Sequence, residues 1–108
     1  MLPKKNRTNK KEVEKIFKYG RSVNSSFFTF RFKLNSDSTT PQISFIAPKS
    51  VARLAVKRNL LRRRGYSVLE KHLFKFPPGF MGVFIFKKYQ DDILIIENEI
   101  KNILIKIN

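Results

Sequence analysis

Arg58, Arg62, Arg63 and Arg64 lie within seven residues of one another, with no acidic residue among them. Guanidinium groups hold phosphate oxygens with paired hydrogen bonds and stack on bases, so this cluster has the chemistry to bind a nucleic acid. A solvated helix face usually mixes charges of both signs, but no acid lies between residues 37 and 70. A solvated basic face is the alternative, and the unbalanced charge favours an external polyanion.

The segment that positions these arginines runs from Lys49 to His72, and its apolar residues recur at helical spacing. They predict one face of a helix of roughly five to six turns. A second face is predicted at spacings of i, i+3, i+4 and i+7. The apolar face contains Leu54, Leu61, Gly65, Val68, Leu69 and His72, and the second face contains Asn59, Arg62, Arg63 and Tyr66.

Side chains for acid–base or metal chemistry are scarce. His72 is the only histidine and falls on the apolar side of the basic helix, where a packed histidine is more common than a catalytic one. Asp91 and Asp92 fit a helix start better than a catalytic pair. We find no Walker loop, no Ser/His/Asp arrangement and no His/Cys metal spacing. We therefore expect no catalytic residue, no protein metal site and no small-molecule substrate.

The charge is concentrated in the first two-thirds of the chain. Residues 1–75 hold 19 Lys and Arg and 4 acids, whereas residues 76–108 hold 4 of each. Residues 1–75 therefore carry all of the net +15. A length of 108 residues predicts a single domain, residues 1–108. Such a basic domain favours nucleic acid as partner. A membrane surface is second, because the apolar residues are needed for a core.

The composition also bears on location. The chain has no cysteine, which is compatible with a reducing compartment. Residues 1–11, MLPKKNRTNKK, lack the apolar segment of a signal peptide, and no apolar run is long enough to span a membrane. We expect a cytoplasmic protein without membrane contact. Residues 1–8 are either a disordered tail or an arm that contacts phosphates.

A short first helix is expected after this arm. Asn9 as N-cap and Glu12 three residues later predict its start. Val13, Ile16 and Phe17 give an apolar stripe, and Gly20 follows as the residue after the C-cap. About ten residues are too few for a helix to persist alone, so we expect it to pack on a sheet.

Residues 25–34, SSFFTFRFKL, alternate as a strand with one buried face. The even-numbered residues from Phe28 to Leu34 are expected to point into the core. The other face carries Phe27, Arg31 and Lys33, a combination that suits base stacking and phosphate contact. We interpret Phe27 as half-covered by the first helix and Arg31 as a functional residue.

The rest of the chain completes an α+β pattern. Residues 35–41 predict a polar turn, and residues 42–47 a second strand that forms an antiparallel hairpin with the first. After the basic helix, the nearly continuous apolar run of residues 80–87 predicts a strand covered on both faces. Residues 91–106 predict a last helix. The expected order is helix, strand, strand, helix, strand, helix.

Residues 49–63 resemble the signature of the protein subunit of bacterial ribonuclease P. In that family a lysine precedes a basic helix that carries Ala-Val, one residue, Arg-Asn and further basic residues. Here these positions are Lys49, Ala55-Val56, Lys57, Arg58-Asn59 and Arg62-Arg63. Upstream, residues 2–7 resemble the basic opening of the family, and residues 17–21 its Phe-Lys-x-Gly segment. The resemblance covers essentially the whole chain.

The resemblance implies a fold like domain 2 of ribosomal protein S5, with a fourth short strand and a left-handed crossover through the basic helix. It implies that an RNA subunit removes the 5′ leader of precursor tRNA, using Mg²⁺ held mainly by that RNA. The basic helix would bind the RNA subunit, and a cleft beside the first helix would hold the single-stranded leader at Phe17 and Arg31. The helix pattern and the resemblance together predict these RNA-binding residues: Lys49, Arg53, Lys57, Arg58, Asn59, Arg62, Arg63, Arg64 and Tyr66.

The chain departs from the family pattern at several positions of the helix. Leu60 follows Arg-Asn where a basic residue is usual, and Tyr66 replaces a basic residue. Arg64 and Gly65 stand where apolar residues are common, and Arg64 or Arg53 could supply the charge absent at position 60. A ribosomal or other structural RNA-binding protein is the competing hypothesis, and a DNA-binding helix is a weaker third.

Overall fold

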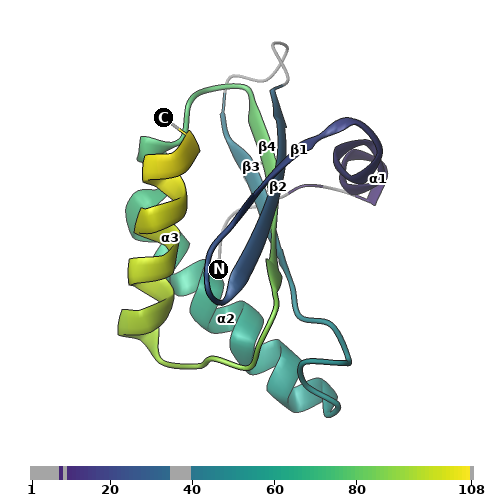
Figure 1. Ribbon diagram of the computed structural model, residues 1–108, viewed down its shortest axis with the longest axis vertical. Helices are drawn as coiled ribbons and strands as arrows, with labels where there is room; N and C mark the ends of the chain where they lie inside the picture. The colour runs from purple at the N-terminus through teal and green to yellow at the C-terminus, as the bar shows by residue number, and fades with distance from the viewer. Residues whose placement is uncertain (1–7, 9, 35–39, 108) are drawn as a thin grey trace.

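The computed structural model describes residues 8, 10–34 and 40–107 (Figure 1). Residues 1–7 of the predicted basic arm and the cap at Asn9 lie outside these residues, as does most of the polar turn. In the described part, three α-helices pack on the two faces of one sheet. The elements are α1 (Lys10–Tyr19), β1 (Arg21–Asn24), β2 (Phe28–Leu34), β3 (Gln42–Ile46), α2 (Ala55–His72), the short 3₁₀ helix η2 (Leu73–Lys75), β4 (Phe80–Phe86) and α3 (Ile93–Ile107).

The strand order in the sheet is β1-β2-β4-β3. β1 is the fourth strand that the resemblance implied, and it pairs with β2 antiparallel, Val23 opposite Phe30. The predicted hairpin between β2 and β3 is wrong, because β4 lies between them. β4 pairs antiparallel with β2 and parallel with β3. Its run of buried residues explains why it takes the central place: this strand is covered on both faces.

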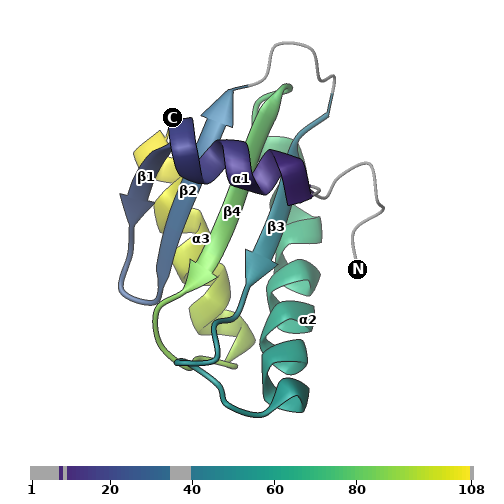
Figure 2. The same cartoon turned by 90° about the vertical axis from the view of Figure 1, so that its right-hand side faces the viewer.

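The connection from β3 to β4 runs through α2 and is left-handed (Figure 2). Viewed from the α1 side, both strands point downward, α2 returns behind the sheet, and β4 lies to the left of β3. Such crossovers are right-handed in nearly all parallel pairs, so the exception is an informative feature of this fold. It agrees with the connection that the resemblance implied.

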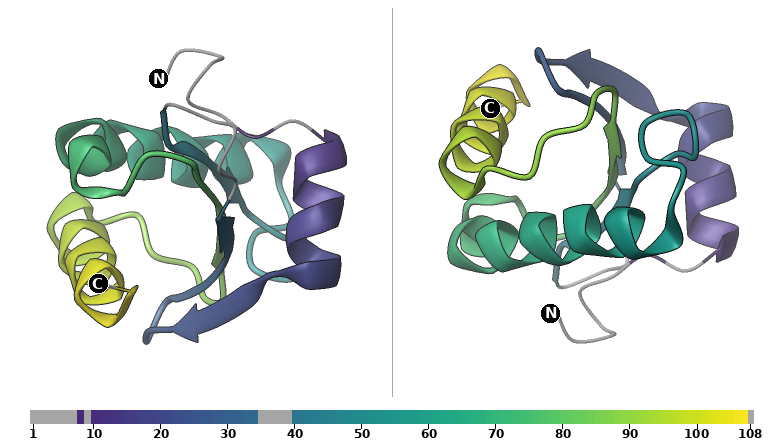
Figure 3. Two further views of the ribbon diagram at one scale, coloured as in Figure 1. Left: turned by 90° about the horizontal axis from the view of Figure 1, so that it is seen from above. Right: turned by 90° about the horizontal axis from the view of Figure 1, so that it is seen from below.

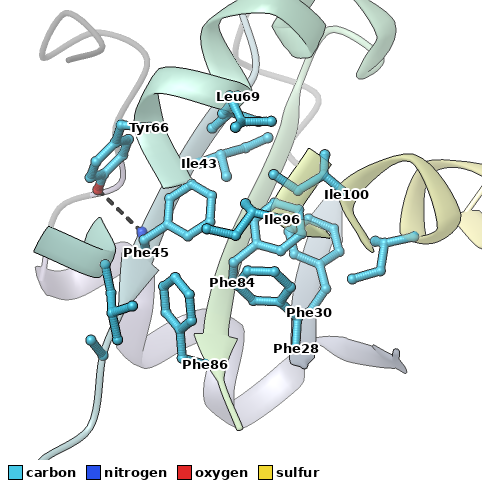
Figure 4. Packing of buried hydrophobic residues seen from close by; sticks show 14 of the residues in the cluster. Phe28, Phe30, Ile43, Phe45, Tyr66, Leu69, Phe84, Phe86, Ile96 and Ile100 are labelled. Carbon is cyan, nitrogen blue, oxygen red and sulfur yellow. Dashed lines mark hydrogen bonds between the residues drawn. The ribbon is translucent and has the colours of Figure 1, made fainter. Parts of the chain in front are cut away.

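Helices α2 and α3 cover one face of the sheet and α1 crosses the other (Figure 3). Phenylalanines dominate the larger core, on the α2–α3 side (Figure 4). The rings of Phe30 and Phe84 stack with centroids 4.2 Å apart, and those of Phe45 and Phe84 stack at 5.0 Å. Under α1, Ile16 packs with Met81 and Val83 in a smaller cluster. The alternation predicted for β2 is confirmed for Phe28, Phe30 and Phe32, which belong to or pack against the larger core. It is wrong for Leu34 at the end of the strand, which is 67% exposed.

Gly20 follows α1 as predicted, but its backbone is not in the left-handed conformation that usually explains a glycine after a helix. Within the described residues the only glycine with a positive φ is Gly79. A Cβ atom on Gly20 would instead overlap the carbonyl oxygen of Ile16 in α1 and lie 2.8 Å from the carbonyl oxygen of Phe32 in β2. Glycine is required here because the chain leaves α1 close to the backbone of both elements.

The turn between β1 and β2 is fixed by α3. Phe27 is half-buried as expected, but it packs against the core on the α2–α3 side rather than under the first helix. Its backbone N–H donates a 2.7 Å hydrogen bond to Glu99 Oε1. Lys106 Nζ donates to the carbonyl oxygen of Asn24 at 2.6 Å. Two charged residues of α3 thus serve the fold.

His72 packs against α3, as predicted for a structural histidine. Its Nε2 atom lies 3.0 Å from Glu97 Oε2 and joins α2 to α3. The hydrogen bond from His72 is the largest effect on Glu97 and lowers the pKa of its carboxyl below the ordinary 4.5, although desolvation opposes it. Lys101 and Lys71 lower this pKa further.

This lowered pKa predicts a loss of stability in acid. The contribution of Glu97 is fully present above the unfolded-state pKa of 4.5 and disappears as the pH falls through the lower folded-state pKa. Thermal melts of the wild type and of Glu97→Gln, taken from neutral pH downward, should converge in this acidic range. Parallel curves at every pH would show that the His72–Glu97 contact contributes no linkage.

Candidate nucleic-acid interface

The N-terminal half of α2 presents a basic surface to solvent. Lys57, Asn59, Arg62 and Arg63 are exposed, and this end of the helix reaches beyond the strands (Figure 2). Val56, Asn59, Arg62 and Arg63 line a hollow of about 390 Å³. We call this surface the α2 basic face. Val56 was missed by the sequence analysis, although its spacing of i−3 from Asn59 places it on that face.

Arg58 is directed inward to the turn that precedes the helix. Its Nη1 atom donates hydrogen bonds to the carbonyl oxygens of Ala52, at 3.0 Å, and Arg53, at 2.7 Å. Leu54 occupies the N-cap without a side-chain hydrogen bond, so the Arg58 guanidinium braces this helix start. Leu54 is itself exposed, and its predicted place in the apolar stripe is wrong.

Tyr66 does not belong to the α2 basic face, and that prediction is wrong. Its side chain is 2% exposed, and its hydroxyl oxygen accepts a hydrogen bond from the backbone N–H of Phe45 at 3.2 Å (Figure 4). Helical spacing gives an angle around the axis but not how far the sheet covers the helix along its length. At position 66 the helix lies against β3, and the phenol suits a site with one polar partner.

The remaining predicted residues lie around the start of α2. Lys49 and Arg53 are exposed in the segment before the helix. Leu60 and Arg64 are half-buried. Desolvation and the hydrogen bond to Asp91 raise the pKa of Tyr89, and the charge of Arg64 opposes this rise. Arg64 is not among the residues that line the hollow.

On the opposite face of the sheet, the structure brings Phe17 and Arg31 together. Phe17 is 41% exposed, so it is not a core residue. The guanidinium carbon of Arg31 lies 5.5 Å from the centroid of its ring, and Arg31 Nη2 donates to the Phe17 carbonyl oxygen at 2.8 Å. The two residues were expected to flank a groove; they form one aromatic–cation pair where α1 crosses β2.

The described part of the chain offers neither a cluster of metal ligands nor a membrane span. In residues 8, 10–34 and 40–107 no group of three or more His, Cys, Asp or Glu side chains is placed to hold a metal ion. No helix in the same ranges is long and apolar enough to cross a membrane.

Comparisons with known proteins all match this chain to one protein family. A family model described as ribonuclease P matches residues 2–108. The chain is 35% identical over 75 residues to the ribonuclease P protein component of Carboxydothermus hydrogenoformans, a match that covers 68% of this chain and 64% of that protein. It is 26% identical over 80 residues to that of a Pseudanabaena species, covering 73% and 69%.

Solved structures share the fold at low sequence identity. The ribonuclease P protein of Thermotoga maritima superposes with a TM-score of 0.81 at 22% identity, covering 94% of this chain and 97% of that one. The protein of Staphylococcus aureus superposes with a TM-score of 0.78 at 20% identity, covering 93% and 91%. These likenesses establish the α+β fold. The family model spans nearly every residue of the chain. We conclude that this chain belongs to the ribonuclease P protein family.

Proposed function

We propose that this chain is the protein subunit of a ribonuclease P, which binds a catalytic RNA subunit and precursor tRNA and assists removal of the 5′ leader. The observation that carries the proposal is the family match over residues 2–108, combined with the exposed cations of α2. The competing hypothesis of a ribosomal protein has no support among these matches. A cytoplasmic location follows from this function as part of the same proposal.

In this proposal the α2 basic face binds the RNA subunit. Arg62 and Arg63 are exposed beside Asn59, and no carboxylate among the described residues pairs with either guanidinium. Guanidinium groups in such a setting can bind phosphate oxygens without first breaking an internal salt bridge. Lys49, Arg53 and Lys57 extend the positive surface, whereas Arg58 acts by holding the helix start.

The single-stranded leader is assigned to the other face of the sheet. Phe17 offers a partly exposed ring at the surface of α1, and Arg31 supplies a fixed positive charge beside it. A base can stack on the ring while the guanidinium lies close to a phosphate. The hydrogen bond from Arg31 to the Phe17 carbonyl orients both groups before RNA arrives.

The hydrolytic step is assigned to the RNA subunit. As the family resemblance implies, Mg²⁺ is expected to be held mainly by the RNA, where phosphate oxygens serve as its ligands. When bound there, Mg²⁺ would supply the activated water. The residues of this chain position the RNA: α2 by phosphate contacts, and α1 with β2 by holding the leader.

Replacing Phe17 by alanine should weaken binding of precursor tRNA far more than binding of mature tRNA. Stacking on an aromatic ring contributes about 1–3 kcal/mol per base, which corresponds to roughly 5- to 150-fold at tenfold per 1.4 kcal/mol. Because the ring is partly exposed, the melting temperature should change little. Affinities of the reconstituted particle for both tRNAs, with melts of each variant, provide the measurement.

Phe74→Ala is a matched control, because this ring is 80% exposed and lies in η2, remote in sequence from α1. It should leave both affinities unchanged. Arg31→Ala should likewise affect the precursor selectively. Equal loss for precursor and mature tRNA in Arg31→Ala would refute the leader site.

A further inference from the structure

Tyr19 forms a second aromatic–cation cluster, on the other side of α1 from Phe17. Residues two positions apart in an α-helix point about 200° away from each other around its axis. Arg31 and Lys33 share one face of β2. Arg31 pairs with Phe17, and Lys33 places its Nζ atom 5.5 Å from the centroid of the Tyr19 ring. Helix α1 therefore lies between two similar pairs.

The Tyr19 cluster has the features of a stacking platform. The tyrosine side chain is 65% exposed, and Lys18 Nζ lies 5.4 Å from its ring centroid. Beside it is a hollow of about 250 Å³. The residues that line the hollow are Tyr19, Arg21, Phe32, Lys33 and Leu34. Exposed tyrosine, apolar side chains and three cations thus converge at one edge of the sheet.

The cations of this cluster are available to a ligand. Among the described residues no carboxylate pairs with Lys18, Arg21 or Lys33. By contrast, the charged groups of Arg58 and Lys106 donate hydrogen bonds to backbone carbonyl oxygens. An exposed aromatic ring with two lysines over it, neither paired with a carboxylate of the described residues, matches an unpaired nucleotide. The base stacks on the ring while the phosphates lie near the cations.

We infer that Tyr19, with Lys18, Arg21 and Lys33, is a second site for an unpaired RNA nucleotide, separate from the Phe17–Arg31 pair. The inference rests on the proposed RNA-binding function and extends it to a surface outside the leader site. The nucleotide can come from a leader that continues past α1 or from an unpaired segment of the RNA subunit. The chemistry at the ring is the same in both cases.

A direct test uses the absence of tryptophan from the chain. Tyr19→Trp introduces the only tryptophan, whose emission can be excited apart from that of the remaining tyrosines, and base stacking should quench it when a short oligouridylate is added. Phe74→Trp is the matched control, since that exposed ring also has a lysine nearby, with Lys75 Nζ at 5.9 Å. Duplex RNA and an oligoglutamate peptide should leave the fluorescence of Tyr19→Trp unchanged. Absent or equal quenching in the two variants would overturn the site, as would quenching by the peptide.

Affinity measurements then identify the source of the nucleotide. Tyr19→Ala should weaken binding by roughly 5- to 150-fold, whereas Tyr19→Phe, which keeps the ring, should bind like the wild type. The loss should occur with precursor tRNA carrying a long leader but not a short one if the leader is the source. It should occur with the RNA subunit alone if that RNA is the source. Wild-type affinity of Tyr19→Ala for all of these RNAs would overturn the inference.

Failure of this site can be told apart from failure of the proposed function. If the wild-type protein stimulates leader removal but the Tyr19 variants behave normally, only the second site is refuted. If the wild-type protein neither binds nor stimulates the RNA subunit, the proposed function fails. Quenching of Tyr19→Trp by single-stranded RNA in that case would still support an RNA-binding surface at α1.

Discussion

Replacing Arg62 and Arg63 together by alanine is expected to weaken assembly with the RNA subunit by at least about tenfold, because hydrogen bonds to charged groups contribute about 1.5–3 kcal/mol each. Both side chains are exposed on the α2 basic face. The salt dependence should also change. Each lost phosphate contact lowers the slope of log affinity against log salt by about 0.7–0.9, so the slope should become shallower by about 1.4–1.8.

The control is a double variant that removes the same charge elsewhere. Lys88 and Lys101 are exposed and lie outside α1 and α2. Lys88→Ala with Lys101→Ala should leave the salt slope near that of the wild type. If this control lowers the slope as much as the arginine variant does, net charge and not the α2 basic face explains the binding.

Gly65→Ala should destabilise the fold, although alanine normally favours a helix over glycine by about 1 kcal/mol. A Cβ atom at Gly65 would lie 2.7 Å from two carbons of the Phe45 ring. That ring is 3% exposed and stacked on Phe84, so it has little room to move. Overpacking of this kind costs about 1–3 kcal/mol. Set against the gain in helix propensity, this leaves a net loss of up to about 2 kcal/mol in unfolding free energy, measured by denaturant titration.

Two further variants make the cause explicit. Ser67→Ala, at an exposed position of the same helix, should leave stability unchanged or raise it slightly. Phe45→Leu should cost less stability in the Gly65→Ala background than in the wild type, because the smaller side chain relieves the overlap. A stabilised Gly65→Ala protein would contradict the close contact between α2 and β3.

The elements of the fold could be predicted from local patterns, whereas the order of the strands could not. The alternation of Phe28, Phe30 and Phe32 and the apolar run of β4 were sufficient for two strands. The strand with which β3 pairs could not be predicted in this way. A short loop after β2 allows β3 to pair with β2 as a hairpin, but it also allows another strand to lie between the two. Strand β4, with Val83 and Phe84, lies between β2 and β3 in the sheet but follows an 18-residue helix in the sequence. No local pattern in β2 or β3 could reveal that β4 separates them.

The candidate site shows the same limit. The exposed positions of Asn59, Arg62 and Arg63 followed from helical spacing, and the resemblance supplied Phe17 and Arg31 as a pair. Spacing could not reveal that Tyr66 meets the sheet, where it binds the Phe45 backbone. It also could not reveal that Arg58 turns back to brace the start of α2. Both depend on how the chain outside the helix folds around it.

The most direct test of the proposed function is leader removal in a reconstituted reaction. Precursor tRNA is incubated at low Mg²⁺ with the cognate RNA subunit, with this protein, or with both, and the released 5′ leader is measured. The account predicts that both components together remove the leader much faster than the RNA alone, and that the protein alone removes none. A protein that does not accelerate the RNA, or that cleaves the precursor without it, would contradict the assignment of this chain as the protein subunit of ribonuclease P.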